Sequence, residues 1–401
     1  MESKTILQDP ASSSSDRTIW RIAPGVKFMA AKLRVGNFRI LNNSSLPVYF
    51  GTEGIYSLLT RISIQNLEGT EIDSLFGDAL LMAAVRLLSA ENAQEYSINR
   101  QLAQNMCCSI TTPSLSQIAL TEKVNTDSAT MLSAYIDISA MLSYLKQRVI
   151  IDEGLIIQLE WNVPSFVQNG YSYDRPPCLM FDEVISNLEA DKAPVYVYPT
   201  IISERLAIPV SSTTPGVVSN TFQRRLNSYY GQYLQRMYFA LITDPLDSGS
   251  SISPYNLAYA ALDESLLLYV DGRLLIPGPS SVNTPAKKLA YATDFNGPLC
   301  LTGLESHYAG ISAYGTSGTN PNLFGLTNPN TGVLMSGVLS FGCIKIGQFI
   351  TNDLTIEYSA SLSGAENSYV YLSLMTEVLR TYNKESGITS NLQMPPTVNT
   401  I

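Results

Sequence analysis

The sequence predicts a mainly β protein made of two tandem eight-stranded jelly-roll β-sandwiches with short helical inserts. Three observations lead to this fold class. Most periodic segments alternate apolar and polar residues with the period of a β-strand. Two landmarks of the first half recur in the second half at a nearly constant spacing. The length of 401 residues suits about two domains.

The first half contains strand patterns separated by turn residues. The clearest is the segment 60–66, in which Ile62 and Ile64 share one face and polar residues share the other. A turn at Gly69 joins it to a return strand at 71–73, which predicts a hairpin. The other predicted strands are 17–22, 27–41, 48–50, 134–138 and 155–161. The predicted helices are 74–104, which is long and rich in Ala and Leu, and 139–147.

The second half repeats this style. The pair Asp271-Gly272 follows a strand pattern at 265–270 and predicts a tight hairpin with a return strand at 273–276. The further predicted strands are 195–202 with a continuation at 206–210, 231–242, 337–346, 354–359 and 368–374. The polar segment 221–230 is predicted to be helical. The stretch 303–337 is rich in Gly, Asn, Pro and Ser and predicts a long surface loop.

Two pairs of landmarks indicate an internal duplication. The hairpin residues Gly69 and Gly272 are 272 − 69 = 203 positions apart. The strand starts Leu155 and Leu354 are 354 − 155 = 199 positions apart. Two such similar offsets favour two copies of one β unit, and a coincidence between generic hairpins is the alternative. Each unit has about eight short strands, which suits two packed antiparallel sheets of the jelly-roll kind.

Composition divides the chain into five parts. The N-terminus is polar and rich in Ser, and the segment 163–177 contains three prolines with Gly and Asn, as is typical of a linker. From residue 387 the chain is again polar and contains Pro. The predicted parts are a flexible N-terminal arm at 1–16, a first jelly roll at 17–164, a linker at 165–177, a second jelly roll at 178–386 and a C-terminal tail at 387–401.

The charge content restricts the function. Only 15% of the residues are charged and 45% are hydrophobic, so neighbouring subunits are expected to cover much of the surface. The net charge of −9 argues against direct nucleic-acid binding, because such binding needs basic residues against phosphate. No apolar run is long enough for a membrane span, and the N-terminus lacks the apolar centre of a signal peptide. Synthesis in the cytoplasm is therefore expected.

Few residues suggest catalysis or metal binding. His307 is the single histidine, and no GxSxG, GxxxxGK or GxGxxG motif is present. The cysteines are Cys107, Cys108, Cys178, Cys300 and Cys343. Their scattered spacing favours buried, reduced thiols over a zinc site.

Three other sets of residues admit a functional interpretation. The paired carboxylates Asp152-Glu153, Asp182-Glu183 and Asp263-Glu264 could serve as glycosidase acids or bind calcium. Neighbouring strand residues point to opposite faces, however, and Asp is common in turns. The pair Arg224-Arg225 suits a solvated face or a subunit salt bridge better than an anion site. A carbohydrate platform is conceivable for Tyr229, Tyr230, Tyr233 and Tyr238, although packing is the commoner use of Tyr. We expect no catalytic, cofactor-binding or metal-binding residue.

The order of the landmarks resembles that of a known family. A strand leads through residues 54–62 into the turn segment 66–73, and the segment 135–145 precedes the strand at Leu155. The second half supplies residues 266–276 and the last strand at Leu354. This order is similar to that of the double jelly-roll major capsid proteins of the tectivirus, adenovirus and polinton-like virus lineage. The resemblance covers most of the chain and rests on element order and local style, without an invariant motif.

The resemblance implies a structural protein of the virion without enzymatic activity or cofactor. It implies homotrimers whose six jelly rolls form pseudo-hexagonal capsomers that tile an icosahedral shell. The implied partners are neighbouring capsomers, penton and minor capsid proteins, and an internal membrane or core protein under the shell. Residues 303–337 and 74–104 become candidates for the outer surface or for contacts between subunits. The arm and the tail become candidates for contacts with the inner layer or with adjacent capsomers.

Two alternatives stay open at this point. A penton or minor capsid protein built from similar β units would form pentamers. A carbohydrate-binding β-sandwich protein would bind glycans as a monomer, and it would usually need an export signal, which the sequence lacks. The oligomeric state separates these functions.

Overall fold

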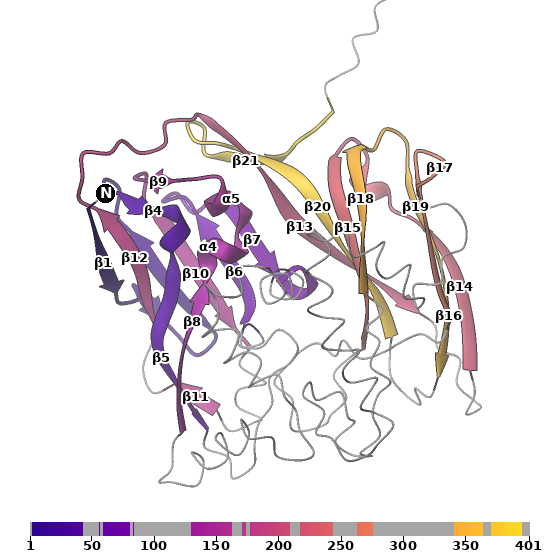
Figure 1. The fold of residues 1–401 in the computed structure, drawn as a ribbon, viewed down its shortest axis with the longest axis horizontal. Coiled ribbons are helices and arrows are strands. Elements are labelled where there is room, and N and C mark those ends of the chain that lie inside the picture. The colour runs from indigo at the N-terminus through magenta and orange to yellow at the C-terminus, as the bar shows by residue number, and fades with distance from the viewer. Residues whose placement is uncertain are drawn as a thin grey trace, which may run out of the picture.

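The structure is a computed structural model. The residues that it describes are 2–42, 56, 59–80, 83, 130–162, 171–173, 177–208, 217–243, 263–275, 341–363 and 370–394. The predicted strand 48–50, the predicted loop 303–337 and most of the predicted helix 74–104 lie outside them. The described strands form four antiparallel sheets, which make two β-sandwiches that lie side by side (Figure 1).

The first sandwich is formed by the residues before position 185. Its sheet 1A has seven strands: β1 (Ser3–Gln8), β4 (Phe28–Met29), β5 (Arg34–Asn42), β8 (Thr130–Asp137), β9 (Ile150–Ile151), β11 (Tyr171–Tyr173) and β12 (Cys178–Val184). Its sheet 1B has five: β2 (Ser12–Ser13), β3 (Arg17–Ile22), β6 (Leu59–Gln65), β7 (Glu71–Phe76) and β10 (Leu155–Trp161). The short helices are η1 (Ala30–Lys32), α4 (Ile138–Met141) and α5 (Ser143–Lys146).

The second sandwich begins at residue 195. Its sheet 2A has five strands: β13 (Val195–Ile208), β15 (Tyr233–Thr243), β18 (Phe341–Phe349), β20 (Val370–Asn383) and β21 (Ile388–Asn391). Its sheet 2B has four: β14 (Val217–Arg225), β16 (Asp263–Val270), β17 (Arg273–Leu274) and β19 (Leu354–Ser363). The turn η4 (Asn227–Tyr229) lies between β14 and β15.

The two sandwiches have the same strand order. The path β3-β10-β6-β7 in sheet 1B matches the path β14-β19-β16-β17 in sheet 2B. In sheet 1A the pairings run β8-β5-β12-β1, and in sheet 2A they run β18-β15-β20-β13. Eight strands in this order form a jelly roll. The predicted fold class is therefore confirmed, and the landmark hairpins β6–β7 and β16–β17 occupy equivalent places in the two copies.

Buried and partly exposed residues alternate along β10, which lies in the middle of sheet 1B. Leu155, Ile157, Leu159 and Trp161 are buried, and the residues between them are partly exposed. Burying a side chain such as Leu or Ile stabilises the fold by roughly 1.5–3 kcal/mol. The Trp161 indole N–H also donates a hydrogen bond of 2.8 Å to the hydroxyl of Thr18 on β3. Apolar burial on one face and a ladder on each side thus fix this strand.

The β16–β17 turn uses the backbone conformation that an Asp-Gly pair favours. The φ angles are 50° at Asp271 and 75° at Gly272, both in the left-handed region that a type I′ turn requires. The Asp271 carboxylate accepts hydrogen bonds from the backbone N–H groups of Thr351, Asn352 and Asp353, at 3.0, 2.6 and 3.2 Å. The turn is therefore tied to the connection between β18 and β19.

Both ends of the described chain belong to sheets, which corrects the predicted flexible arm and tail. β1 pairs with β12 along its whole length. β21 pairs with β20, and the Thr389 hydroxyl donates a hydrogen bond of 2.9 Å to the Glu71 carbonyl. A polar, Ser-rich composition predicts flexibility, but strand pairing uses backbone groups, and most side chains of β1 are exposed. Residues 395–401 of the tail lie outside the described residues.

The sheet pairing also differs from the predicted boundary between the two units. β12 follows the predicted linker 165–177, yet its partners β1, β4 and β5 all come from the first 42 residues. The next strand, β13, pairs with β20 in the second sandwich. Residues 185–194 therefore connect the two sandwiches. The prolines of the predicted linker lie in the connection between β10 and β12, within the first unit.

The predicted helix at 221–230 is wrong for most of its length. β14 runs to Arg225 and pairs with β19 over its whole length, and only the short turn η4 follows. Its polar side chains suggested a helix, whereas they belong to an edge strand on which residues 223–225 are exposed. The predicted helix at 139–147 is confirmed as α4 and α5. The segment 74–104 begins as strand β7 and becomes helical at residues 77–80.

Candidate functional site at the junction of the two sandwiches

The two sandwiches share part of their hydrophobic core. Sheet 2A lies next to the first sandwich, with β13 in contact with β7 and α5 (Figure 1). The large buried cluster of the first sandwich also includes residues of the second, namely Tyr196, Tyr198, Ile201, Tyr238, Met375 and Tyr382. Side chains of one jelly roll thus complete the interior of the other.

The sequence at the start of β13 explains this contact. Tyr196 and Tyr198 are buried in the shared core, whereas Val195 and Val197 are 45% and 46% exposed. Successive side chains of a strand point to opposite faces, so the sequence VYVY presents an aromatic face to the first sandwich. The hydroxyl of Tyr198 donates a hydrogen bond of 2.5 Å to the carbonyl of Ile72 on β7.

Tyr144 on α5 meets this aromatic face. Its ring makes edge-to-face contacts with Tyr196, Tyr198 and Tyr382, at centroid distances of 5.7, 5.4 and 5.7 Å. Such pairs contribute about 0.5–1.5 kcal/mol each beyond the area that they bury. Asp137 accepts a hydrogen bond at the N-terminus of α4 and so helps to fix the two short helices that position Tyr144.

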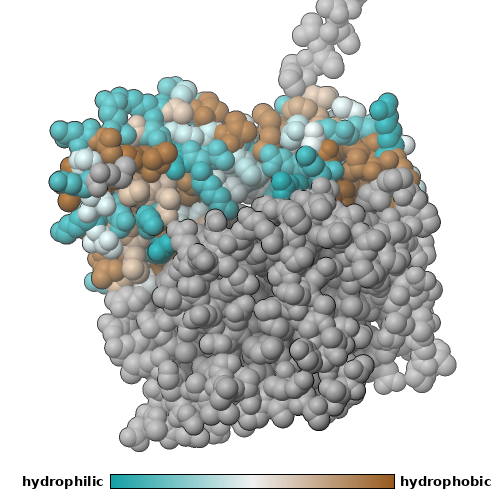
Figure 2. Space-filling model, viewed as in Figure 1, coloured by the Kyte–Doolittle hydropathy of each residue, from teal (hydrophilic) through white to brown (hydrophobic). Residues whose placement is uncertain are grey.

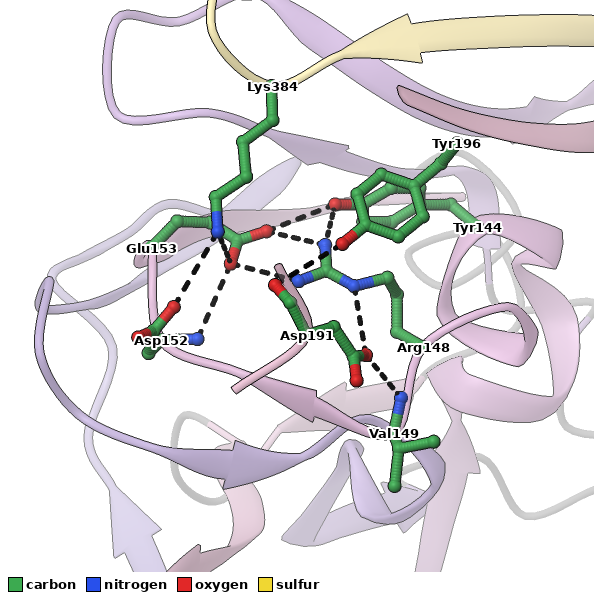
Figure 3. Close-up of polar contacts among 8 residues, drawn as sticks. All are labelled: Tyr144, Arg148, Val149, Asp152, Glu153, Asp191, Tyr196 and Lys384. Carbon is green, nitrogen blue, oxygen red and sulfur yellow. Dashed lines mark hydrogen bonds and ion pairs between the residues drawn. The ribbon is translucent and has the colours of Figure 1, made fainter. Parts of the chain in front are cut away.

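Arg148 forms the centre of a polar network beside these rings (Figure 3). Its side chain is fully buried, and its guanidinium donates to both oxygens of Glu153, at 2.6 and 3.0 Å. Its Nε atom donates to Asp191 at 3.2 Å. It also donates to the hydroxyl of Tyr144, and its Cζ atom lies 4.2 Å from the centre of the Tyr196 ring. This buried cation therefore has acceptors and aromatic faces around it.

Lys384 connects the second sandwich to this network. It follows β20, and its Nζ atom lies 3.3 Å from Glu153 Oε2 and 3.7 Å from Asp152 Oδ1 (Figure 3). Burial alone would raise the pKa of Glu153, but hydrogen bonds and positive charge from Arg148, together with Lys384, lower that pKa to about 2. Glu153 is thus a carboxylate at neutral pH, held by cations from both sandwiches.

Two more carboxyl groups of the first sandwich are buried at the junction. Asp78 accepts hydrogen bonds of 2.8 and 2.6 Å from Arg205 on β13, and one of 2.6 Å from Ser373 on β20. Asp73 accepts hydrogen bonds from Tyr144 and Thr200. Each of these acids therefore contacts the second sandwich directly.

The geometry describes a joint rather than a reaction centre. Arg148, Glu153, Asp191 and Lys384 are engaged with one another, as are Arg205 and Asp78, and aromatic rings pack between the two sandwiches. Within the described part of the chain, no group of His, Cys, Asp and Glu is arranged to hold a metal ion. Of the helices that the structure describes, none is long and apolar enough to cross a membrane. What this site can do is hold two jelly rolls in one orientation.

The residues singled out in the sequence are not brought into one site. Several have side chains outside the described part of the structure: Cys107, Cys108, Asp263, Glu264, Cys300, His307 and Cys343. Cys178 is buried, and its thiol donates a hydrogen bond of 3.3 Å to Asp9. Asp182 accepts a hydrogen bond of 2.8 Å from Thr5 at the surface.

The tyrosine and arginine sets are also dispersed. Tyr229 and Tyr238 are buried, whereas Tyr230 is 61% exposed. The hydroxyl of Tyr233 donates to a backbone carbonyl of β18 at 2.9 Å. Arg225 lies on the edge strand β14, 3.5 Å from an acid in the β18–β19 connection. These tyrosines do not form one platform.

Among the predicted candidates that the structure describes, the pair Asp152-Glu153 belongs to the polar network of the junction, and Tyr238 belongs to the shared core. Sequence reasoning treats Asp152-Glu153 as a turn and does not identify Arg148, which lies between α5 and β9 and explains the burial of Glu153. One signal was available: the alternation of Tyr and Val in VYVY marks a strand whose aromatic face needs a covering partner.

Comparisons with known proteins identify the fold. No family model and no curated protein sequence matches the chain. The mavirus major capsid protein matches 97% of this chain and 90% of its own length, with 11% identity and a TM-score of 0.54. A chain of the Sputnik virophage structure matches 98% of this chain and 88% of its own length, with 11% identity and a TM-score of 0.56. The protein therefore has the double jelly-roll fold of viral major capsid proteins.

Proposed function

We propose that this protein is the major capsid subunit of an icosahedral virion. Three copies form a homotrimeric capsomer, and their six jelly rolls give the capsomer a pseudo-hexagonal outline that tiles the shell. The protein acts as a building block and not as an enzyme. Its location is the virion, after synthesis and assembly in the host cell.

The observation that carries this proposal is the pairing of two jelly rolls of the same strand order, with a shared core, in one chain. A capsomer with six lobes needs a fixed angle between the two lobes of each subunit. We infer this constraint from the shared core, the buried Arg148–Glu153 pair and the partly buried Arg205–Asp78 pair. The match to the mavirus major capsid protein over 97% of the chain supports the same function.

The low charge and the exposed apolar side chains of the surface support the proposal that copies of the chain bury part of it against one another. Only 15% of the residues are charged, and large apolar side chains are exposed in the described part, including Leu7, Phe76, Val149 and Ile185 at 58%, 51%, 62% and 60%. Figure 2 shows apolar areas between polar ones on the described part of the visible face. Obligate subunit interfaces exclude charge and cover such residues. Neighbouring capsomers, with penton and minor capsid proteins, are the partners that we propose.

The negative net charge of the chain supports the proposal that this subunit does not bind the genome directly. A net charge of −9 does not favour binding to nucleic-acid phosphate. We therefore propose that an internal membrane or a separate core protein lies between this subunit and the nucleic acid.

The oligomeric state of the purified full chain tests the function. Mass photometry is expected to give the mass of three chains, and negative-stain images are expected to show a particle with a pseudo-hexagonal outline. A pentamer would reassign the protein to the penton or minor capsid class. A stable monomer that binds glycans on an array would instead favour a carbohydrate-binding β-sandwich protein.

A further inference from the structure

One buried carboxyl group of the junction differs from its neighbours. Asp73 and Asp78 are 1% and 2% exposed, and the side chain of Glu153 is 14% exposed. Asp78 and Glu153 each accept two hydrogen bonds from an arginine. The hydrogen bonds described for Asp73 come from uncharged groups, the backbone N–H of Tyr144 at 3.0 Å and the hydroxyl of Thr200 at 3.3 Å.

The elements packed around Asp73 contribute few charges. β7 itself carries Glu71, which is already paired with Arg61 of β6. β13 presents Tyr198, a neutral phenol, beside Asp73, and α5 presents the ring and backbone of Tyr144. The positive charge that acts on Asp73 is Arg380 of β20.

Burial dominates the titration of Asp73. It raises the pKa of Asp73 from 3.8 to about 6, although the N–H of Tyr144, the charge of Arg380 and the hydroxyl of Thr200 each lower it. The physical reason is that a carboxylate loses its hydration in the shared core and gains no direct ion pair in return.

We propose that Asp73 makes the joint between the two jelly rolls sensitive to protons, so that the joint is tightest when this carboxyl is neutral. A neutral Asp73 donates its O–H to the Thr200 hydroxyl, which can accept as well as donate, and the hydrogen bond across the junction is kept. An ionised Asp73 places a charge in the core between the sheets, which favours separation of the sheets and entry of water.

The direction of the effect follows from linkage. In the opened or unfolded chain Asp73 loses its proton near its ordinary pKa of 3.8, and in the closed joint it does so near 6. The contribution of Asp73 to the stability of the joint therefore falls as the pH rises from about 4 to about 6, and this contribution stays constant above that range. Two pH units correspond to about a hundredfold weakening of joint closure. Glu153 has the opposite shift, so the joint as a whole is strongest near pH 4.

The substitution Asp73→Asn tests this inference, because Asn has the shape of a neutral Asp. Unfolding midpoints of the full-length protein are measured from pH 4 to pH 8. The variant is expected to equal the original protein at pH 4, to exceed it at pH 8, and to lose the slope between pH 4 and 6. Asp182→Asn is the matched control, because Asp182 lies at the surface beside Thr5 and should leave the slope unchanged.

An unchanged slope in Asp73→Asn overturns the inference. If that variant does not fold, hydrogen exchange of the original protein decides instead. Protection factors of β7 and β13 are expected to be lower at pH 8 than at pH 5, and equal values would overturn the inference. This outcome is independent of the proposed function, since that function is decided by the mass of the oligomer.

Discussion

One connection of the jelly roll has different roles in its two copies. In the first copy, the chain between β8 and β10 forms α4 and α5 and provides Tyr144, Arg148 and Glu153 to the junction. In the second copy, the equivalent connection between β18 and β19 is the short segment 350–353, which the Asp271 carboxylate holds. The comparison shows that a duplicated unit can keep its strand order while one loop is rebuilt as an interface.

The two connections also differ in how far their contacts reach. The network of the first copy joins the buried Arg148 to the partly exposed Asp191, which is distant in sequence, and it includes Lys384 from the second sandwich. The contacts of Asp271 are mostly exposed and stay between the β16–β17 turn and the β18–β19 connection, within the second sandwich. Breaking the Arg148 network should therefore lower the stability of the whole molecule. Breaking the contacts of Asp271 should loosen the structure near the β16–β17 turn.

The largest expected effect comes from Arg148→Met. The variant leaves Glu153 buried without its bidentate partner and removes the contact with Asp191. Removing one partner of a buried ion pair costs about 3–5 kcal/mol of unfolding free energy. The measurement is urea unfolding at pH 7. A loss below about 1 kcal/mol would show that the network adds little to the joint.

Lys384→Met is the matched control for that experiment. Its side chain is 28% exposed, and it reaches the same Glu153 carboxylate from the rim. Solvent reaches this pair, and Arg148 still neutralises Glu153 in the variant, so the loss should be much smaller than that of Arg148→Met, about 1 kcal/mol.

The loss of unfolding free energy at acidic pH should depend on Glu153. Its pKa is lowered from 4.5 to about 2, so its contribution is present above pH 4.5 and is lost as the pH falls toward 2. This shift corresponds to about 3 kcal/mol. Thermal unfolding is measured for Glu153→Gln and the original protein from pH 2 to pH 5. The unfolding midpoint of the variant should fall less steeply with decreasing pH than that of the original protein. The same steepness in both proteins would exclude Glu153 as the source.

A smaller effect is expected from Asp271→Ala. The variant loses the hydrogen bonds to the β18–β19 connection and places Ala at a φ of 50°, where a side chain is disfavoured. We expect a loss of about 1–2 kcal/mol, with raised hydrogen exchange confined to β16, β17 and the turn. Asp271→Asn, which tolerates this backbone conformation, should lose less. A loss as large as that of Arg148→Met would contradict the comparison.

Local alternation made several strands predictable from the sequence. The predicted bounds of β3 and β10 agree with the structure, in which every second residue of both strands is buried. The Asp271-Gly272 turn was predictable because few residues adopt its left-handed conformation. In contrast, most side chains of β1 are exposed, and so are residues 223–225 of β14; the pairing of these strands with β12 and β19 depends on backbone groups that sequence periodicity does not report.

The junction was much less predictable than the strands. Arg148 is a single cation between α5 and β9. The residues near it in the sequence do not predict its contact with Asp191 or its connection to Lys384 through Glu153. Asp191 and Lys384 reach this network only when the connection between the sandwiches and the end of β20 pack against the first sandwich. A pattern read within about ten residues does not contain that information.

The shared core has a consequence for how the protein can change over time. Tyr196, Tyr198 and Tyr382 fill a space whose other walls come from the preceding jelly roll. A substitution on one wall alters the fit of the opposite wall, so successful changes there must occur in matched sets. Although the two halves share one architecture, we expect a jelly roll taken from a relative to fit this junction poorly.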